Sequence, residues 1–301
     1  VVAASAGNHA QGVALAAQML GLKATVFMPA GAPIPKERAT RGYGATVHLV
    51  GATVDESLAQ ASAFAERTGA VFVHPFDHVD VIAGQGTVGL EIVEQCPDVA
   101  TVLVPTGGGG LLGGVAAALP DGVRVVGVQA GGAAAWPPSL VAQAPTALPV
   151  MRTLADGIAV GRPGDVTFPQ VTALVDEILT VDDDALSRAL LHCLERAKLI
   201  VEPAGAAAVA ALLEHPRRFA TPVVAVLSGG NIDPMVLGHM IRHGMVVAAR
   251  HVELRLRIAD RPGVLAHADP LVVAHLVAAG LARPDAVAVD LALHAAARAA
   301  G

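Results

Sequence analysis

TVLVPTGGGGLLGGVAAAL, residues 101–119, decides the fold class of this chain. A short Val-rich run, Thr101–Pro105, leads into four consecutive glycines, Gly107–Gly110, and then into a helical stretch, Leu111–Leu119. A strand, a glycine-rich turn and a helix in this order are typical of α/β proteins with parallel sheets. Four glycines let the backbone curl so tightly that several N–H groups can point at one phosphate. A plain flexible loop is the alternative interpretation.

The same alternation continues along most of the chain. Val-rich runs that predict strands are Ala24–Met28, Thr46–Val50, Val71–Val73, Thr101–Pro105, Val123–Gln129, Ile178–Val181 and Thr221–Leu227. Stretches that predict helices are His9–Leu20, Lys36–Tyr43, Asp55–Thr68, Asp80–Gln95, Leu111–Leu119, Asp184–Lys198, Ala204–Leu213 and Met235–His243. The Pro/Ala-rich stretch Trp136–Pro149 is predicted to be a loop or an irregular crossover. Short apolar strands between amphipathic helices indicate an α/β fold with parallel sheets covered on both faces.

Composition excludes several classes of protein. The chain has 301 residues, is 53% hydrophobic and 15% charged, and carries a net charge of −6. It lacks a basic cluster, so nucleic acid is not an expected partner, and no apolar run reaches the ~18 residues of a membrane span. Cys96 and Cys193 are far apart and have no metal-ligand spacing, as expected of reduced thiols in a cytoplasmic protein.

Two further glycine-rich turns carry polar side chains. Ser5-Ala6-Gly7-Asn8-His9 opens a helix whose first N–H groups are unpaired, which suits a carboxylate. A plain N-cap by Ser5 or Asn8 is the alternative. Ser228-Gly229-Gly230-Asn231 follows a strand, and its alternative is a turn in which Ser228 is a local cap.

The glycine run also satisfies a dinucleotide-binding pattern. Gly108, Gly110 and Gly113 match G-x-G-x-x-G, which is a weak signal alone. A dinucleotide fold needs an acidic residue at the end of the next strand to hold the ribose. That strand ends at Gln129, with no Asp or Glu nearby. A monophosphate cofactor therefore fits better than NAD.

Together the three turns resemble the fold-type II pyridoxal-phosphate enzymes, most closely the threonine dehydratases (threonine ammonia-lyases). Segments 36–45, 155–160 and 202–206 share this resemblance, which extends from Val1 to about Gly244. It implies a two-lobed catalytic domain over residues 1–245, similar to the tryptophan synthase β chain. The small lobe would span about 1–75 and the large lobe about 76–245.

The resemblance also implies roles for individual residues. Those expected to bind pyridoxal 5'-phosphate are Asn8, Gly107, Gly108, Gly109, Gly110, Leu111 and Ser228. Those expected to bind the substrate carboxylate are Ser5, Ala6, Gly7, Asn8 and His9. The Ser228 hydroxyl would meet the pyridine nitrogen, which does not enforce a protonated ring and suits β-elimination. Glu202 would either lie near the ring or place charge at a helix N-terminus.

The reaction implied is conversion of L-threonine to 2-oxobutanoate and ammonia, with L-serine giving pyruvate. It would serve isoleucine biosynthesis or threonine catabolism, in a cytoplasmic homo-oligomer. Other activities of the same fold type remain open: serine racemase, serine dehydratase, cysteine synthase and threonine synthase. A non-catalytic pseudoenzyme that binds an amino acid or phosphate is a further alternative.

Two features depart from the family pattern. The Schiff-base lysine lies in a Ser-Phe-Lys block upstream of the Ser5–His9 turn, and the chain as written begins at Val1. Its lysines are Lys23, Lys36 and Lys198, and none occupies that block. No catalytic residue is therefore identifiable, and the chain as written is expected to be an inactive fragment. Residues 129–135 also lack the carboxylate that related members use for a divalent cation, so no magnesium or calcium is expected there.

The C-terminal residues change character. Val252–Ile258 alternates polar and apolar residues, as a half-exposed strand does. The following Asp260–Leu265 resembles the first turn of an ACT regulatory domain, and the resemblance stops after Ala266. Residues 250–301 are therefore predicted to be an incomplete ACT-like segment.

Overall fold

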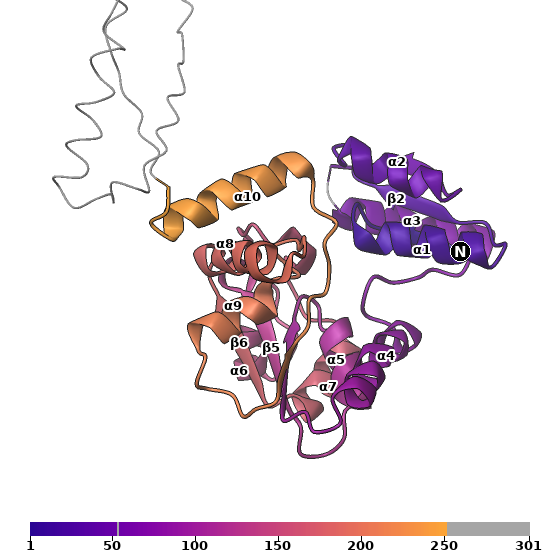
Figure 1. The fold of residues 1–301 in the computed structure, drawn as a ribbon. Helices are drawn as coiled ribbons and strands as arrows, with labels where there is room; N and C mark the ends of the chain where they lie inside the picture. The colour runs from indigo at the N-terminus through magenta and orange to yellow at the C-terminus, as the bar shows by residue number, and fades with distance from the viewer. Residues whose placement is uncertain (53, 252–301) are drawn as a thin grey trace, which may run out of the picture.

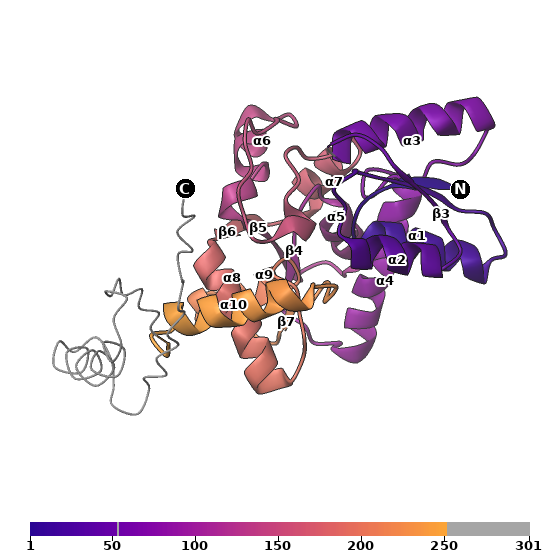
Figure 2. The same cartoon turned by 90° about the horizontal axis from the view of Figure 1, so that it is seen from above.

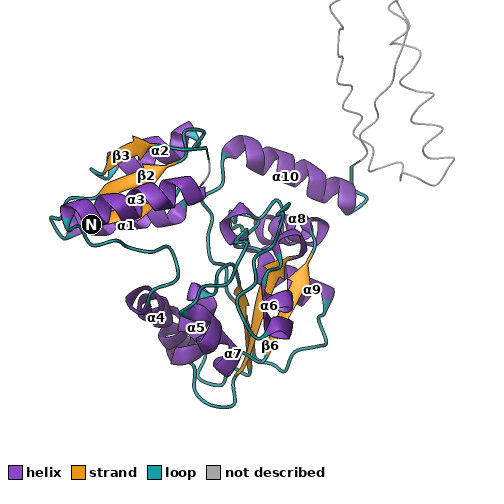
Figure 3. Ribbon diagram, turned by 180° about the vertical axis from the view of Figure 1, so that it is seen from behind, coloured by secondary structure: helices purple, strands orange, loops and turns teal. Residues whose placement is uncertain are grey.

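The strands of this protein form two parallel sheets. The computed structural model describes residues 1–52 and 54–251. Strands β1 (Val2–Ala4), β2 (Thr25–Met28) and β3 (Thr46–Leu49) form the first sheet, in the order β1-β2-β3. Strands β4 (Thr101–Pro105), β5 (Arg124–Ala130), β6 (Glu177–Val181) and β7 (Val223–Ala225) form the second, in the order β6-β5-β4-β7. All pairs are parallel, and Figure 3 shows helices around both sheets.

The helices fall into two groups, one with each sheet. Their bounds are α1 (Asn8–Met19), α2 (Ile34–Gly42), α3 (Val54–Thr68), α4 (Val79–Gln95), α5 (Gly110–Ala118), α6 (Trp136–Ala142), α7 (Thr167–Leu174), α8 (Asp183–His192), α9 (Ala207–Glu214) and α10 (Pro234–Val247). Short helical turns are η1 (Gly131–Ala133), η2 (Asp156–Ile158) and the π-type turn η3 (Cys193–Ala197). Figures 1 and 2 show α1, α2 and α3 with the first sheet, apart from the group around the second. This arrangement gives the α/β fold that the sequence predicts, while the lobe limits at 75 and 245 stay predictions.

Strand β4, one of the two inner strands of the second sheet, is buried on both faces. Leu103 packs in one cluster with residues of α8 and α9, including Leu186 and Ala207. Val102 and Val104 point to the other face, where they pack with Leu112 of α5. Because successive side chains of a strand point to opposite faces, an all-apolar run of this kind belongs in a sheet covered on both sides. The buried strand fixes where the glycine turn emerges.

Two local predictions are wrong. Residues 71–73 form no strand, and Phe72 makes only an isolated parallel bridge to Val2. The predicted loop after residue 135 begins instead with helix α6, Trp136–Ala142. Two prolines follow Trp136 in that helix's first turn, where a missing N–H costs nothing because no helical acceptor exists for it.

Two further sequence predictions concern a membrane span and the C-terminal segment. No helix within residues 1–52 and 54–251 is long and apolar enough to cross a bilayer. Almost all of the predicted ACT-like segment (residues 250–301), from residue 252 onward, lies outside the described residues.

Candidate functional site

The glycine turn lies at the carboxyl end of β4 and at the start of α5. Gly109 is the N-cap residue of α5 and has a φ of +104°, a backbone conformation that favours glycine. The N–H groups in the first turn of a helix have no acceptor inside the helix. Within the described chain, the N–H groups of Gly107–Gly110 make no hydrogen bond to a carbonyl or side chain. The turn therefore offers a set of free donors at one point.

Two side chains hold the carbonyl groups of this turn. Trp136 Nε1–H donates to the Gly107 carbonyl at 2.8 Å. Thr167 Oγ1–H donates to the Gly108 carbonyl at 2.6 Å. In a trans peptide the C=O and the following N–H point in opposite directions. Because the Gly107 and Gly108 carbonyls point toward Trp136 and Thr167, the N–H groups of Gly108 and Gly109 point away from these two side chains.

Large side chains pack against the turn so closely that no Cβ fits there. A Cβ at Gly109 would lie 2.6 Å from the Trp136 ring and 3.0 Å from Thr167 Cβ, and one at Gly108 would overlap the Phe76 ring. Trp136 is itself fully buried and stacks on Phe168, with ring centroids 5.7 Å apart. The glycines are therefore required by packing as well as by backbone conformation. The result is a rigid cradle of donors with the chemistry that a phosphate needs.

The Ser5–His9 turn precedes α1, which begins at Asn8. The N-cap residue is Gly7, and no side chain caps the helix. Ser5 Oγ instead accepts a hydrogen bond from Gly7 N–H at 3.1 Å. His9 Nε2–H donates to the Val73 carbonyl at 2.9 Å. Burial lowers the pKa of His9, opposed in part by that hydrogen bond, so a neutral ring is favoured. The first N–H groups of α1 stay available to an anion, and the plain N-cap interpretation finds no support.

Glu202 joins the Ser5–His9 turn to the Ser228–Asn231 turn. Asn8 Nδ2–H donates to Glu202 Oε1 at 2.9 Å, between residues 194 positions apart. Glu202 N–H donates to the Gly229 carbonyl at 3.1 Å. A Cβ at Gly229 would overlap Glu202 Oε1 and lie 3.3 Å from Asn8 Nδ2. The Ser5–His9 turn and the Ser228–Asn231 turn therefore meet at the carboxyl group of Glu202.

The strand register brings Ser228 to the same sheet edge as the glycine turn. Leu103 of β4 pairs with Ala225 of β7, and the two strands are parallel. Ser228 lies three residues beyond Ala225, as Thr106 lies three beyond Leu103, and Ser228 is exposed. The segment Asp156–Val160 lies between the glycine turn and Glu202 and contacts both. A Cβ at Gly107 would lie 3.0 Å from Val160 Cγ2, and one at Gly157 would lie 3.4 Å from Glu202 Oε1.

Burial gives Glu202 an altered acidity. Desolvation raises the pKa of its carboxyl group, and the charge of Asp156 raises it further, while the Asn8 hydrogen bond and the charge of Lys36 lower it in part. A raised pKa in the folded state means that the folded chain binds the proton more tightly than the unfolded chain. The associated stability is complete below the ordinary Glu range and is lost as the pH rises through the raised value.

Glu202→Gln should therefore raise the melting temperature at neutral pH and leave it almost unchanged in acid. The Gln side chain keeps an oxygen for Asn8 and removes the charge that burial disfavours. Thermal unfolding at about pH 4 and about pH 8 measures the effect. Glu66→Gln, at an exposed position on α3, is the matched control. Equal shifts in the two variants would contradict a buried, proton-binding Glu202.

The described part of the chain shows no candidate metal site. Residues 1–52 and 54–251 contain no group of three or more His, Cys, Asp or Glu side chains placed to hold a metal ion. Gln129 is fully buried, and its Oε1 accepts from the Trp136 backbone N–H at 3.0 Å. The expected absence of magnesium or calcium stays a prediction.

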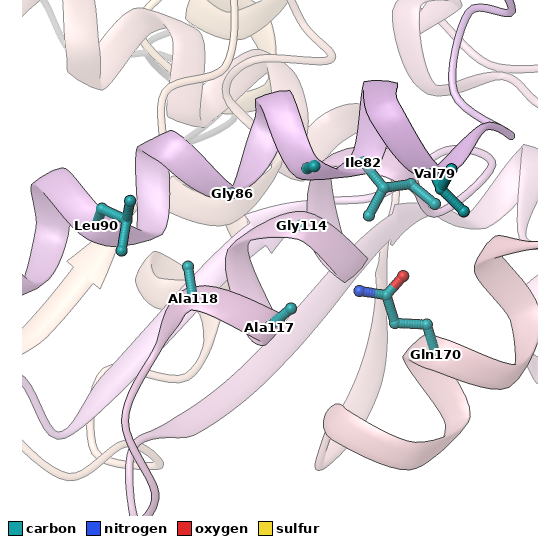
Figure 4. Close-up of a pocket in the computed structure, with 9 residues that line it drawn as sticks. Val79, Ile82, Gly86, Leu90, Gly114, Ala117, Ala118 and Gln170 are labelled. Carbon is teal, nitrogen blue, oxygen red and sulfur yellow. The ribbon is translucent and has the colours of Figure 1, made fainter.

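A separate apolar hollow lies between α4 and α5, away from these turns. Figure 4 shows Val79, Ile82 and Leu90 along α4 on one side and Ala117 and Ala118 of α5 on the other, with Gln170 of α7 at one end. No predicted site residue lines it. It does not belong to the site around Glu202.

Several residues at the site escaped sequence reasoning. Asp77 accepts hydrogen bonds from the backbone N–H groups of Asp165, Val166 and Thr167 at 2.8–3.1 Å, and so anchors the start of α7 against the glycine turn. Phe76, Trp136 and Thr167 form the wall of the cradle. The chain has a single Trp, next to a Pro-rich stretch that suggested a loop. That rarity is the one sequence signal that could have marked it.

Comparisons with known proteins agree on one family. The pattern of the family described as "Pyridoxal-phosphate dependent enzyme" matches residues 1–229. An L-threonine ammonia-lyase of Geobacter sulfurreducens is 48% identical over 270 residues, which cover 88% of this chain and 67% of that protein. Among solved structures, a threonine deaminase from the source abbreviated T.th. is 44% identical with a TM-score of 0.74, covering 77% of each chain. Maize serine racemase is 37% identical with a TM-score of 0.75, covering 79% of this chain and 75% of its own.

Proposed function

This chain belongs to the pyridoxal-phosphate-dependent enzyme family, and from that premise we propose that its function is that of a threonine dehydratase (threonine ammonia-lyase). The substrate would be L-threonine, giving 2-oxobutanoate and ammonia, with L-serine as a secondary substrate. One observation carries the proposal most directly: Asn8, Glu202 and Gly229, from three segments of the chain, lie in mutual contact. Gly157 and Ile158 connect them to the glycine turn, because Gly157 lies beside Glu202 and Ile158 beside Gly107. The similarity to threonine ammonia-lyase at 48% identity supports the choice of substrate.

The residues present fit pyridoxal 5'-phosphate. The N–H groups of Gly107–Gly110 and Leu111 would hold the phosphate, because they are free and face away from carbonyls anchored by Trp136 and Thr167. Ser228, at the end of β7, would donate to or accept from the ring nitrogen, and Asn8 would lie beside the ring. When bound, the cofactor supplies an electron sink for the amino-acid substrate. A neutral Ser228 hydroxyl would keep that sink moderate, which suits loss of a β-hydroxyl group.

The Ser5–His9 turn would hold the substrate carboxylate. Its donors are the first N–H groups of α1, where the helix dipole favours an anion. The Ser5–Gly7 hydrogen bond holds the turn in shape, and His9 anchors it to Val73. Neutral His9 adds no net charge near the carboxylate, so binding would depend on the backbone donors rather than on an imidazolium.

We also propose the oligomeric state and compartment that the family resemblance implies, a cytoplasmic homo-oligomer. Cys193 is a buried free thiol and Cys96 a half-buried one, as suits a reducing compartment. The apolar hollow along α4, with Val79 and Leu90 more than half exposed, is a surface on which a second subunit could pack.

Binding of pyridoxamine 5'-phosphate should quench the fluorescence of Trp136. The indole donates to the Gly107 carbonyl, so a ligand on the glycine turn lies close to the only Trp in the chain. This ligand carries the phosphate and ring but forms no covalent bond to a lysine. Titration followed by fluorescence gives the dissociation constant.

The same titration of a Ser228→Ala variant tests the proposed contact between Ser228 and the ring nitrogen. Loss of one hydrogen bond to the ring should weaken binding of pyridoxamine phosphate by about fivefold to tenfold, equivalent to about 1 kcal/mol. Inorganic phosphate, which has no ring, should bind both forms equally. An absence of saturable quenching in the unaltered chain would contradict the proposed cofactor site, and an unchanged affinity in the variant would contradict the role of Ser228.

A further inference from the structure

Lys36 is the one lysine side chain of the described chain that forms an ion pair with an acidic side chain. It lies in the first turn of α2, where the helix dipole disfavours a cation. Its side chain is nevertheless only 18% exposed, and its Nζ lies 3.7 Å from Asp156 Oδ2. By contrast, the Lys198 ammonium donates to the Glu195 carbonyl at the end of its own helical turn. Because its helix position is unfavourable and its exposure is low, the placement of Lys36 depends on its ion pair with Asp156.

Asp156 belongs to the segment that links the two halves of the site. It begins η2 (Asp156–Ile158), which is held by hydrogen bonds from Ile158 N–H to the Ala155 carbonyl and from Ala159 N–H to the Asp156 carbonyl. Ile158 packs on Gly107 of the glycine turn, and Gly157 packs beside Glu202. A movement of Asp156 would therefore displace residues that contact the glycine turn on one side and Glu202 on the other.

The Lys36–Asp156 pair joins the two sheet groups, as the Asn8–Glu202 hydrogen bond does. Lys36 and Asn8 come from helices of the first sheet, and Asp156 and Glu202 from segments of the second. Both charges of the pair also reach the Glu202 carboxyl, where Asp156 adds to the rise in pKa caused by burial and Lys36 partly offsets it. The Lys36–Asp156 ion pair and the Asn8–Glu202 hydrogen bond are thus close enough to influence each other electrostatically.

We propose that Lys36 is a positioning residue, whose ion pair with Asp156 holds η2 against the glycine turn and so orders the site for its cofactor. This inference rests on the proposed function for the identity of the ligand. Asp156 is 75% exposed, and an exposed ion pair contributes little to folding, about 0–1 kcal/mol. The pair strengthens when a bound ligand excludes water, because the local dielectric falls. The effect should therefore appear in ligand affinity and in the local order of η2, rather than in the global stability that a melting temperature reports.

Lys36→Ala and Asp156→Ala should each weaken pyridoxamine phosphate binding by about threefold to tenfold. The double variant should lose no more than either single variant, because both remove the same pair. Lys36→Arg should retain most of the affinity. Lys23→Ala, which removes a lysine between α1 and β2, is the matched control and should bind as the unaltered chain does. Melting temperatures should stay close to that of the unaltered chain throughout.

The Asp156→Ala arm separates the proposed role from simple attraction of an anionic ligand. If Lys36 only attracted the phosphate, removing Asp156 would strengthen binding, since a negative charge would be lost. Tighter binding by Asp156→Ala, or unchanged binding by both single variants, would overturn the proposal.

Hydrogen exchange provides a second readout that needs no cofactor. Breaking the pair should speed exchange of the amide groups of Ile158, Ala159 and Val160 in the ligand-free chain, relative to Lys23→Ala. Unchanged exchange there would overturn the positioning role. An unaltered chain that fails to bind pyridoxamine phosphate would instead contradict the proposed function, so the two failures are distinguishable.

Discussion

A polypeptide of residues 1–301 should release no ammonia from L-threonine, whereas the same polypeptide extended by a segment that carries Ser-Phe-Lys should do so. None of the three lysines belongs to a turn that is proposed to hold the cofactor or the substrate. Lys23 precedes β2, Lys36 pairs with Asp156, and Lys198 donates to the Glu195 carbonyl. Residues 1–301 include the turns proposed to bind phosphate and carboxylate, but no lysine among them that the proposal assigns as the proton-transferring base. General-base catalysis alone is worth about 10²–10⁴ in rate, and the covalent role of the lysine adds to this.

The measurement is the formation of 2-oxobutanoate and ammonia with pyridoxal phosphate supplied. The control is the same extension with its lysine replaced by alanine, which should be inactive although it has the same length and otherwise the same residues. Parallel assays with L-serine, scoring pyruvate and D-serine separately, distinguish a dehydratase from a racemase. Ammonia release by residues 1–301 alone, with borohydride trapping the cofactor on Lys23, Lys36 or Lys198, would refute this assignment of roles.

Gly109→Ala should destabilise the chain by about 2–4 kcal/mol and weaken pyridoxamine phosphate binding by at least about tenfold. Two effects combine at this position. The φ of +104° strains any residue with a Cβ, and that Cβ would lie 2.6 Å from the Trp136 ring. Relief of the contact must move the turn or the indole, and either movement should turn the free N–H groups away from the proposed phosphate position.

Gly122→Ala is a matched control for this prediction. Gly122 has a similar φ of +91°, but a Cβ there meets nothing within 4 Å. It should therefore cost only the conformational strain, about 1–2 kcal/mol, and leave binding unchanged. Urea unfolding and the Trp136 titration measure the two quantities. If both variants lost equal stability and retained equal affinity, the packing around Gly109 would not be what shapes the site.

Elements that depend on local patterns could be predicted closely. Thr101–Pro105 was predicted as a strand and forms β4 with those same limits, because an all-apolar Val-rich run bounded by Gly is distinctive. The helix predicted to start near Asp184 begins at Asp183, and Asp182 Oδ1 accepts from the Ala185 N–H at 2.7 Å. A side-chain N-cap is a signal within four residues, so the sequence alone carries it.

Two errors came from signals that tertiary context reverses. Prolines after Trp136 suggested a loop, yet both lie in the first turn of α6, where proline is compatible with a helix. Residues 71–73 have strand-like composition but make a single bridge, between Phe72 and Val2. Whether an apolar run becomes a strand depends on a partner elsewhere in the chain.

The sequence by itself determined the α/β class, the glycine turn between β4 and α5 and the two other turns at which ligands were expected. Each of these depends on residues close together in the chain. Only the tertiary structure decided that Glu202 links Asn8 to Gly229, that Trp136 anchors the Gly107 carbonyl and that Lys36 meets Asp156. These partners lie 27 to 194 residues apart, and nothing in a linear pattern specifies which distant side chains meet. Their contacts follow from the placement of two sheets and the packing of their helices.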